Sequence, residues 1–298
     1  MTYAADSFDI LPRIPSWVIS KHSKIPEDVA FMSGAALSHL HLVLAMPAIP
    51  QDLLRARLAL KAAEVCVTHS GRPERTAELR DAVGFLQPGD SPGPAGEIIL
   101  SWHRAVERPV TVKGLHRALR HVETDQIATW LDGCDPRGAG QGGPVARAAT
   151  VFQAVIEEHP RDYTVSLLLA DAALAQALGW THIRPLLALG LKRADLQKSG
   201  EELRLACHQA ISSTAAQVTR EASDLARRAA RVKEVAPKLR AKGAEEAVAL
   251  FLSRDAVAPT ALASLRSDRA ARRFCDRLVE LGVIHELTGR DTFRLYGI

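Results

Sequence analysis

Residues 267–298 read SDRAARRFCDRLVELGVIHELTGRDTFRLYGI. Ser267 is a good helix N-cap residue. Four apolar residues after it share one face at helical spacing, namely Ala271, Phe274, Leu278 and Leu281. Two short alternating segments, 283–287 and 292–296, then flank a turn that contains Gly289. A short helix followed by a β-hairpin predicts the recognition helix and wing of a winged helix-turn-helix.

The outer side of this helix and hairpin is rich in arginine. Residues 197–298 carry 18 Lys and Arg against 13 Asp and Glu, whereas residues 1–196 carry 20 against 21. Because the basic excess is C-terminal, we expect this segment to contact the phosphates of double-stranded DNA. The predicted nucleic-acid-binding residues are Arg266, Arg269, Arg272, Arg273, Arg290 and Arg294.

Acidic residues on the same helix leave a second interpretation open. The arginines lie in the N-terminal half, which is the half that recognition helices usually insert into the major groove. Arg272 with Asp276, and Arg277 with Glu280, are nevertheless spaced to form ion pairs on the helix surface. A wing can also pack against protein, so the two wing arginines do not decide between the interpretations.

Two upstream segments complete the C-terminal unit. Residues 244–253 predict a first helix, and residues 258–265 predict a short second helix that begins near Pro259. Pro237 and Gly243 break the helix that precedes them. We therefore expect residues 237–298 to form a winged helix-turn-helix-like domain.

The longest predicted element runs from Gly200 to Ala236, a stretch with no proline and no internal glycine. An apolar seam follows it at alternating steps of four and three, through Ile211, Ala215, Val218, Ala222, Leu225, Ala229, Val232 and Ala236. One interpretation is that the seam packs against a helix of the same domain. The other is a homodimer through the Ile211–Ala236 seam, because proteins of this kind often bind twofold-symmetric sites as dimers.

The remaining chain predicts an extended N-terminal arm over residues 1–25 and an all-α domain over residues 26–236. Pro12 and Pro15 keep the arm out of a helix, and we expect Trp17 to anchor it on the body. Two loops rich in glycine and proline, 89–97 and 135–144, lack the features of phosphate-binding loops and predict structural turns. The main body helices are predicted over residues 26–45, 51–68, 74–86, 112–122, 124–131, 145–158 and 162–178.

Composition narrows the class of protein. Aromatic residues make up 5% of the chain, while alanine and leucine are abundant, which favours packed helices over sheet. The four cysteines lie far apart, as reduced thiols of a cytoplasmic protein would. The most apolar segment, 165–180, contains Asp171 and is shorter than a membrane span, and no signal peptide is recognisable, so we expect no membrane contact.

No arrangement typical of catalysis or metal binding stands out. Cys66 and His69 share a helix face, but no second pair of ligands lies nearby in sequence. An enzyme would need a polar cleft built from residues distant in sequence, for instance around Asp90, Glu97 and His103. We therefore expect no cofactor, no metal and no catalytic residues.

Several motifs resemble those of a known family. The segments GDSPGPAGE (89–97), ILSWHRAVERP (99–109), LADAALAQALGW (169–180), APKLRAKGA (236–244) and LTGRDTFRLYGI (287–298) resemble the bacterial family named domain of unknown function 1403. This resemblance covers about residues 37–298 and implies no activity. The tail is also similar to the winged helix that ends Fic proteins. Their catalytic H-P-F-x-x-G-N-G-R motif is missing here, so only the architecture is carried over.

Two functional hypotheses follow. The first is a cytoplasmic, mainly helical protein that binds DNA through its C-terminal winged helix and has a regulatory or replicon-maintenance role. The second is a helical scaffold for protein–protein interaction that has no contact with nucleic acid.

Overall fold

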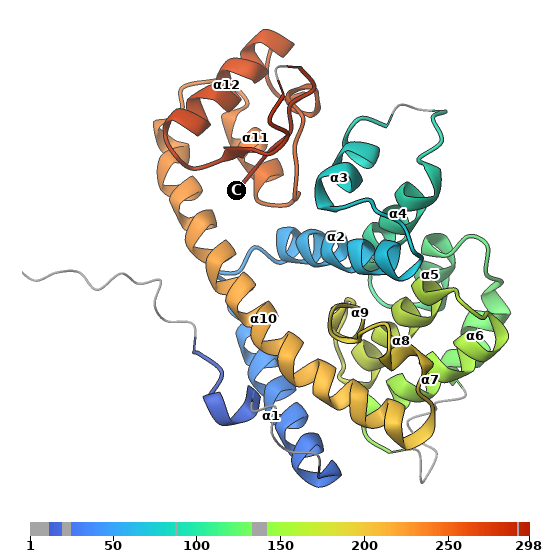
Figure 1. The fold of residues 1–298 in the computed structure, drawn as a ribbon. Helices are drawn as coiled ribbons and strands as arrows, with labels where there is room; N and C mark the ends of the chain where they lie inside the picture. Colours follow the sequence, from blue (N-terminus) through green and yellow to red (C-terminus); the bar gives the residue numbers. More distant parts are fainter. Residues whose placement is uncertain (1–11, 20–24, 87–88, 133–141, 291) are drawn as a thin grey trace, which may run out of the picture.

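The fold comes from a computed structural model that describes residues 12–19, 25–86, 89–132, 142–290 and 292–298. Within these ranges it contains twelve α-helices, short 3-10 turns and one two-stranded sheet (Figure 1). The prediction of a mainly helical protein with one long helix is confirmed. Across the same ranges, no helix combines the length and the apolar character needed to cross a bilayer.

Nine helices of the described chain precede the long one, close to where the sequence predicts them. Proline occupies the first turn of α1 and α7, where its missing N–H costs no hydrogen bond. Thr111 and Asp162 cap the starts of α5 and α8 through their side-chain oxygens. The helices are α1 Pro26–Leu44, α2 Gln51–His69, α3 Thr76–Gly84, α4 Gly93–Glu107, α5 Val112–Ala118, α6 Thr124–Asp132, α7 Pro144–Glu158, α8 Tyr163–Ala177 and α9 Leu186–Gly190.

Helix α8 runs through the body and is buried on all sides from Tyr163 to Ala175. Its one charged residue, Asp171, has no exposed surface. The Asp171 carboxylate accepts hydrogen bonds from the backbone N–H groups of Leu187 and Ala188, at 2.8 and 3.0 Å, and so caps the start of α9. Burial raises the pKa of Asp171 to about 8, against the effect of these bonds. The acid in this apolar segment therefore joins two helices.

The long helix α10 spans Gly200–Val235, 36 residues, and runs diagonally along the molecule (Figure 1). From Ile211 to Val232 the residues of its apolar seam are at most 1% exposed within a single chain. Helices α1, α7 and α9 pack against α10. The seam is therefore covered by the protein's own helices, and a homodimer that used the same residues would first have to uncover them.

The C-terminal unit sits at one end of α10 (Figure 1). It contains α11 Ala244–Phe251, the 3-10 turn η4 Pro259–Ala261, α12 Asp268–Glu280 and the strands β1 His285–Glu286 and β2 Tyr296–Gly297. The strands are antiparallel, with Glu286 opposite Tyr296, and Val257 forms a β-bridge on the other side of Tyr296.

Two elements of this unit are shorter than predicted. The expected helix over residues 258–265 is reduced to η4, because Leu262 and Leu265 turn into the core and the hydroxyl of Ser264 donates to the backbone oxygen of Gly243. The hairpin strands shorten because the Glu286 carboxylate accepts hydrogen bonds from the backbone N–H groups of Thr288 and Gly289. These side-chain contacts replace ladder hydrogen bonds at the turn.

Part of the N-terminal arm lies within the described residues. It forms a 3-10 turn, η1 Ser16–Ile19, that packs on α1. Val18 enters the core at 2% exposure, whereas Trp17 remains 52% exposed and stacks on Phe31 of α1 with ring centroids 5.7 Å apart. Trp17 therefore contacts the body through α1, as expected, while the smaller Val18 is the residue of the arm that becomes buried. Residues 1–11 and 20–24 lie outside the described chain.

Candidate nucleic-acid interface

Helix α12 has one buried and one exposed face. The hydroxyl of Ser267 accepts from the backbone N–H of Ala270 at 3.3 Å, which confirms the predicted N-cap. Ala271, Phe274 and Leu278 are buried at the predicted spacing, whereas Leu281 is 37% exposed just beyond the helix end. Because this apolar stripe faces the core of the C-terminal unit, the opposite side of α12 faces outward (Figure 1).

The exposed side carries the predicted arginines. Arg277 forms an ion pair with Glu280 at 3.0 Å, as its spacing predicts. Arg272 and Asp276 do not pair within 4.0 Å. Four exposed guanidinium groups consequently form no ion pair with any residue in the described ranges, those of Arg266, Arg269, Arg272 and Arg273. Three of them lie in the first half of α12, where they outnumber the one acid of that half, Asp268.

The hairpin arginines are placed differently. Arg290 donates to Asp81 of α3 at 2.7 Å, and its guanidinium lies over the ring of Phe85, 5.5 Å from the centroid. Nε of Arg294 donates to the backbone oxygen of Arg290 at 2.8 Å. Phe293 meets Phe85 edge-on at 5.7 Å, so the hairpin docks on the end of α3. Both predicted phosphate contacts of the wing are thus engaged with the protein itself.

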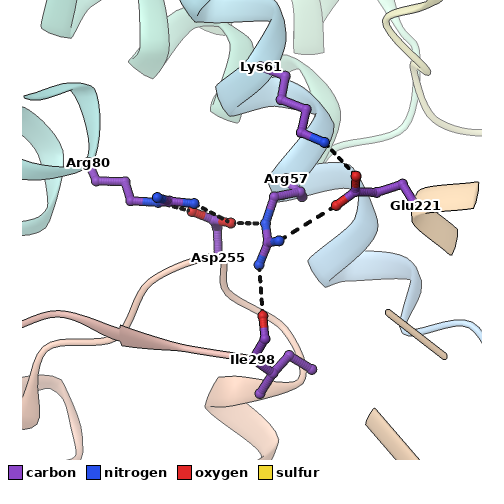
Figure 2. Close-up of polar contacts among 6 residues, drawn as sticks. All are labelled: Arg57, Lys61, Arg80, Glu221, Asp255 and Ile298. Atoms are coloured by element: carbon purple, nitrogen blue, oxygen red, sulfur yellow. Dashed lines mark hydrogen bonds and ion pairs between the residues drawn. The ribbon is translucent and has the colours of Figure 1, made fainter. Parts of the chain in front are cut away.

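A buried ionic network joins the C-terminal unit to the body (Figure 2). Asp255, which follows α11, is 5% exposed and accepts hydrogen bonds from Arg57 of α2 and from Nε of Arg80 of α3, the latter at 2.6 Å. Arg57 also donates to the backbone oxygen of Ile298 at 3.1 Å. Burial alone would raise the pKa of Asp255, but the hydrogen bonds and charges of Arg80 and Arg57 lower it below its ordinary value.

The same network reaches the long helix. Glu221 of α10 pairs with Lys61 of α2 and lies 3.6 Å from the guanidinium of Arg57. Charged residues from α2, α3, α10 and the C-terminal unit therefore meet at one junction (Figure 2). Sequence reasoning missed these residues, because single charges on separate helices carry no signal that they will meet.

The residues weighed for metal binding have other roles. The buried thiol of Cys66 accepts a hydrogen bond from the indole N–H of Trp102 at 3.4 Å, and burial raises the pKa of Cys66 to about 12. His69 packs edge-on against Tyr163, with ring centroids 6.1 Å apart. Across the described ranges, no three His, Cys, Asp or Glu side chains gather closely enough to hold a metal ion.

A polar cleft lies beside the junction, with a volume of about 630 Å³. Of the residues suggested by sequence for such a cleft, His103 lines it, together with Glu107 one turn further along α4. Asp90 and Glu97 are not part of its lining. The cleft brings together residues from five segments of the chain, so its composition could not be read from local motifs.

These features define a mainly helical protein whose small C-terminal unit presents a basic helix on its outer side. The chain belongs to the family described as protein of unknown function (DUF1403), whose model matches residues 2–298. Among curated proteins, none matches the chain. The similarity of the tail to Fic proteins stays a prediction.

Proposed function

We propose that this protein binds double-stranded DNA through the exposed side of α12 and acts as a regulatory DNA-binding protein. The observation that carries the proposal is the set of four exposed arginines on and before α12 that have no ion-pair partner among the described residues. Guanidinium groups left unpaired in this way can replace the counterions of DNA phosphates.

The order of elements in the C-terminal unit supports this proposal. The unit begins with helix α11 and continues through the β-bridge residue Val257 and the 3-10 turn η4. Helix α12 and the two-stranded hairpin follow. This order is typical of a winged helix-turn-helix in which α12 would be the recognition helix. The arginines occupy the N-terminal half of α12, whereas Asp276 and Glu280 lie toward its C-terminal end. With the N-terminal half on the DNA, these two acids would lie away from the phosphates.

The wing arginines are not part of the proposed interface. Arg290 is held by Asp81 and Phe85, and Arg294 by the backbone of Arg290. With four phosphate contacts, the slope of log K against log salt should be about −3 to −4. The expected binding is therefore moderate in strength and strongly weakened by salt.

Fluorescence anisotropy with a labelled duplex of mixed sequence, measured over a salt series, tests the proposal. The double variant Arg269→Ala/Arg273→Ala should bind more weakly and reduce the salt slope by about 2. Arg277→Ala is the matched control, because this arginine lies on the same helix but is paired with Glu280. No binding by the wild type at low salt would refute DNA binding. Equal losses in the control would refute the role of the unpaired Arg269 and Arg273.

A scaffold function rests on a different observation. Large apolar side chains are exposed on η1 and α1, with Phe31 at 66% and Leu42 at 67%. Such a group on one part of the surface is typical of protein contact. If this surface mediates self-association, sedimentation should show an assembly that Phe31→Ser dissociates without affecting DNA binding.

A further inference from the structure

The polar cleft lies where the helical body meets the C-terminal unit. The body contributes residues of α2, α3 and α4, and the C-terminal unit contributes residues between Leu250 and Ala261 and Leu295 of the hairpin. Ligand pockets in proteins occupy about 300–1,000 Å³ and often lie between structural units. A volume of about 630 Å³ is therefore sufficient for a small organic molecule.

Some polar groups of the cleft are already satisfied. Arg80 donates hydrogen bonds to Asp255, and Asp255 also accepts a hydrogen bond from Arg57. Asp52 pairs with Arg55 on the first turns of α2. The charges of Arg80 and Asp255, and of Arg55 and Asp52, are therefore balanced in pairs, although one N–H group of Arg55 stays unused.

Other polar groups of the lining have unused hydrogen-bonding capacity. Nε of Arg55 and Nε2 of His103 are buried and have no hydrogen-bond partner. Buried polar atoms are normally paired, so two orphaned atoms on residues that line one cleft are unusual. Burial lowers the pKa of His103, against the opposing effect of Asp255 and Glu107, so the ring is neutral and can donate or accept one bond at Nε2.

One cation of the cleft is uncompensated. Arg254 is exposed, lines the cleft and forms no ion pair with any residue in the described ranges. Arg55 adds a second guanidinium, whose charge is shared with Asp52. A guanidinium fork binds a carboxylate through two parallel hydrogen bonds. Glu107 is the acid without an ion-pair partner in the lining, and it lies on α4, on the body side.

Apart from Ser253, the rest of the lining is apolar. It consists of aliphatic side chains from both sides of the cleft, namely Leu60, Val83, Ile99, Val106, Leu250 and Leu295. A ligand that uses both the unpaired guanidinium of Arg254 and this apolar surface combines an anionic end with an apolar body. Inorganic anions would leave the aliphatic wall unused.

We propose that this cleft binds a small organic carboxylate, with the carboxylate on Arg254 and Arg55 and the apolar body against the aliphatic wall. Because the cleft is formed by both the body and the C-terminal unit, the bound molecule holds the two together. This site is independent of the proposed DNA-binding face on α12.

The test is the thermal unfolding of the full chain with compounds that share one apolar body and differ in charge. The probes are 3-phenylpropionate and, as the oppositely charged control, phenethylamine. 3-Phenylpropionate should raise Tm in a concentration-dependent way that follows mass action, and phenethylamine should not. No stabilisation by 3-phenylpropionate, or equal stabilisation by the amine, overturns the proposal.

Two variants locate the effect. Arg254→Ala removes an exposed, unpaired side chain, so it should fold normally and weaken the apparent affinity for 3-phenylpropionate at least tenfold. Arg240→Ala removes an exposed arginine outside the cleft and should leave the affinity unchanged. If both variants respond to the carboxylate as the wild type does, the stabilisation is a general salt effect and the site is refuted.

Discussion

Oδ2 of Asp255 lies 2.6 Å from Nε of Arg80, although 175 residues separate the two in sequence. Oδ1 of the same carboxylate accepts from Arg57, so one buried acid contacts two helices of the body. The C-terminal unit is thus attached by a buried ionic junction as well as by the chain itself. This junction lies between α11 and α12 in sequence and adds to the apolar core that the C-terminal unit shares with the body.

Replacing Asp255 should destabilise the protein strongly. In Asp255→Asn, Arg80 loses its counter-charge and Arg57 keeps only Glu221. Removing one partner of a buried ion pair costs about 3–5 kcal/mol. Urea denaturation should show this loss in the free energy of unfolding. Asp224→Asn is the control, because Asp224 pairs with Arg227 on the exposed side of α10 and should change stability by less than about 1 kcal/mol.

The same acid predicts a pH dependence. The pKa of Asp255 is lowered from 3.8 in the folded protein, so the folded state binds this proton less readily than the unfolded chain. The stability that Asp255 contributes is complete above its ordinary pKa and is lost as the pH falls through the lowered value. The difference in unfolding free energy between wild type and Asp255→Asn should therefore shrink below about pH 4. A difference that grows toward acid pH would contradict this assignment.

A substitution at Ala222 tests whether the seam of α10 packs inside one chain or between two chains. Its side chain has no exposed surface in the single chain, so Ala222→Glu places a carboxylate in the core, at a cost of several kcal/mol. We expect circular dichroism to show a destabilised or unfolded protein. Gln217→Glu adds the same group on the exposed side of α10 and should be tolerated. A folded, stable Ala222→Glu variant with a smaller assembly would place the seam in a dimer interface instead.

Gly243 tests how closely the C-terminal unit is packed at its start. Its φ is +86°, and a Cβ atom there would lie 2.2 Å from the backbone oxygen of Ser264. Gly71 has a similar φ of +77° with open space around it. Gly71→Ala should cost about 1–2 kcal/mol for the left-handed backbone alone. Gly243→Ala should cost clearly more in the same urea experiment, because it adds the clash, and equal losses would refute the close packing.

Most helices could be predicted from local signals. Pro26 begins α1 and Ser267 caps α12, and the spacing of apolar residues identified the buried faces. These signals act within a few residues, because caps and periodicity depend on backbone geometry of one turn. The prediction of a second helix in the C-terminal unit was wrong for the same reason, since the burial of Leu262 and Leu265 is a tertiary contact.

The candidate site was only partly predictable. The arginines of α12 lie on the exposed face that the helical spacing indicates, so their exposure to solvent could be predicted from the local sequence. Arg290 could not be placed this way, because Asp81 and Phe85 reach it from a different part of the chain. The polar cleft has the same origin, since its unpaired groups come from α2, α4 and the segment after α11.

By itself, the sequence determined the helical class, the length of α10 and the amphipathic character of α12, since all three follow from short-range periodicity. Tertiary structure alone decided that the α10 seam is covered within one chain, that the C-terminal hairpin docks on α3, and that Asp255 meets Arg57 and Arg80. The physical reason is that an apolar stripe must be covered and a buried charge must be paired, and the local sequence shows only this requirement. Which partner satisfies it depends on how the helices pack.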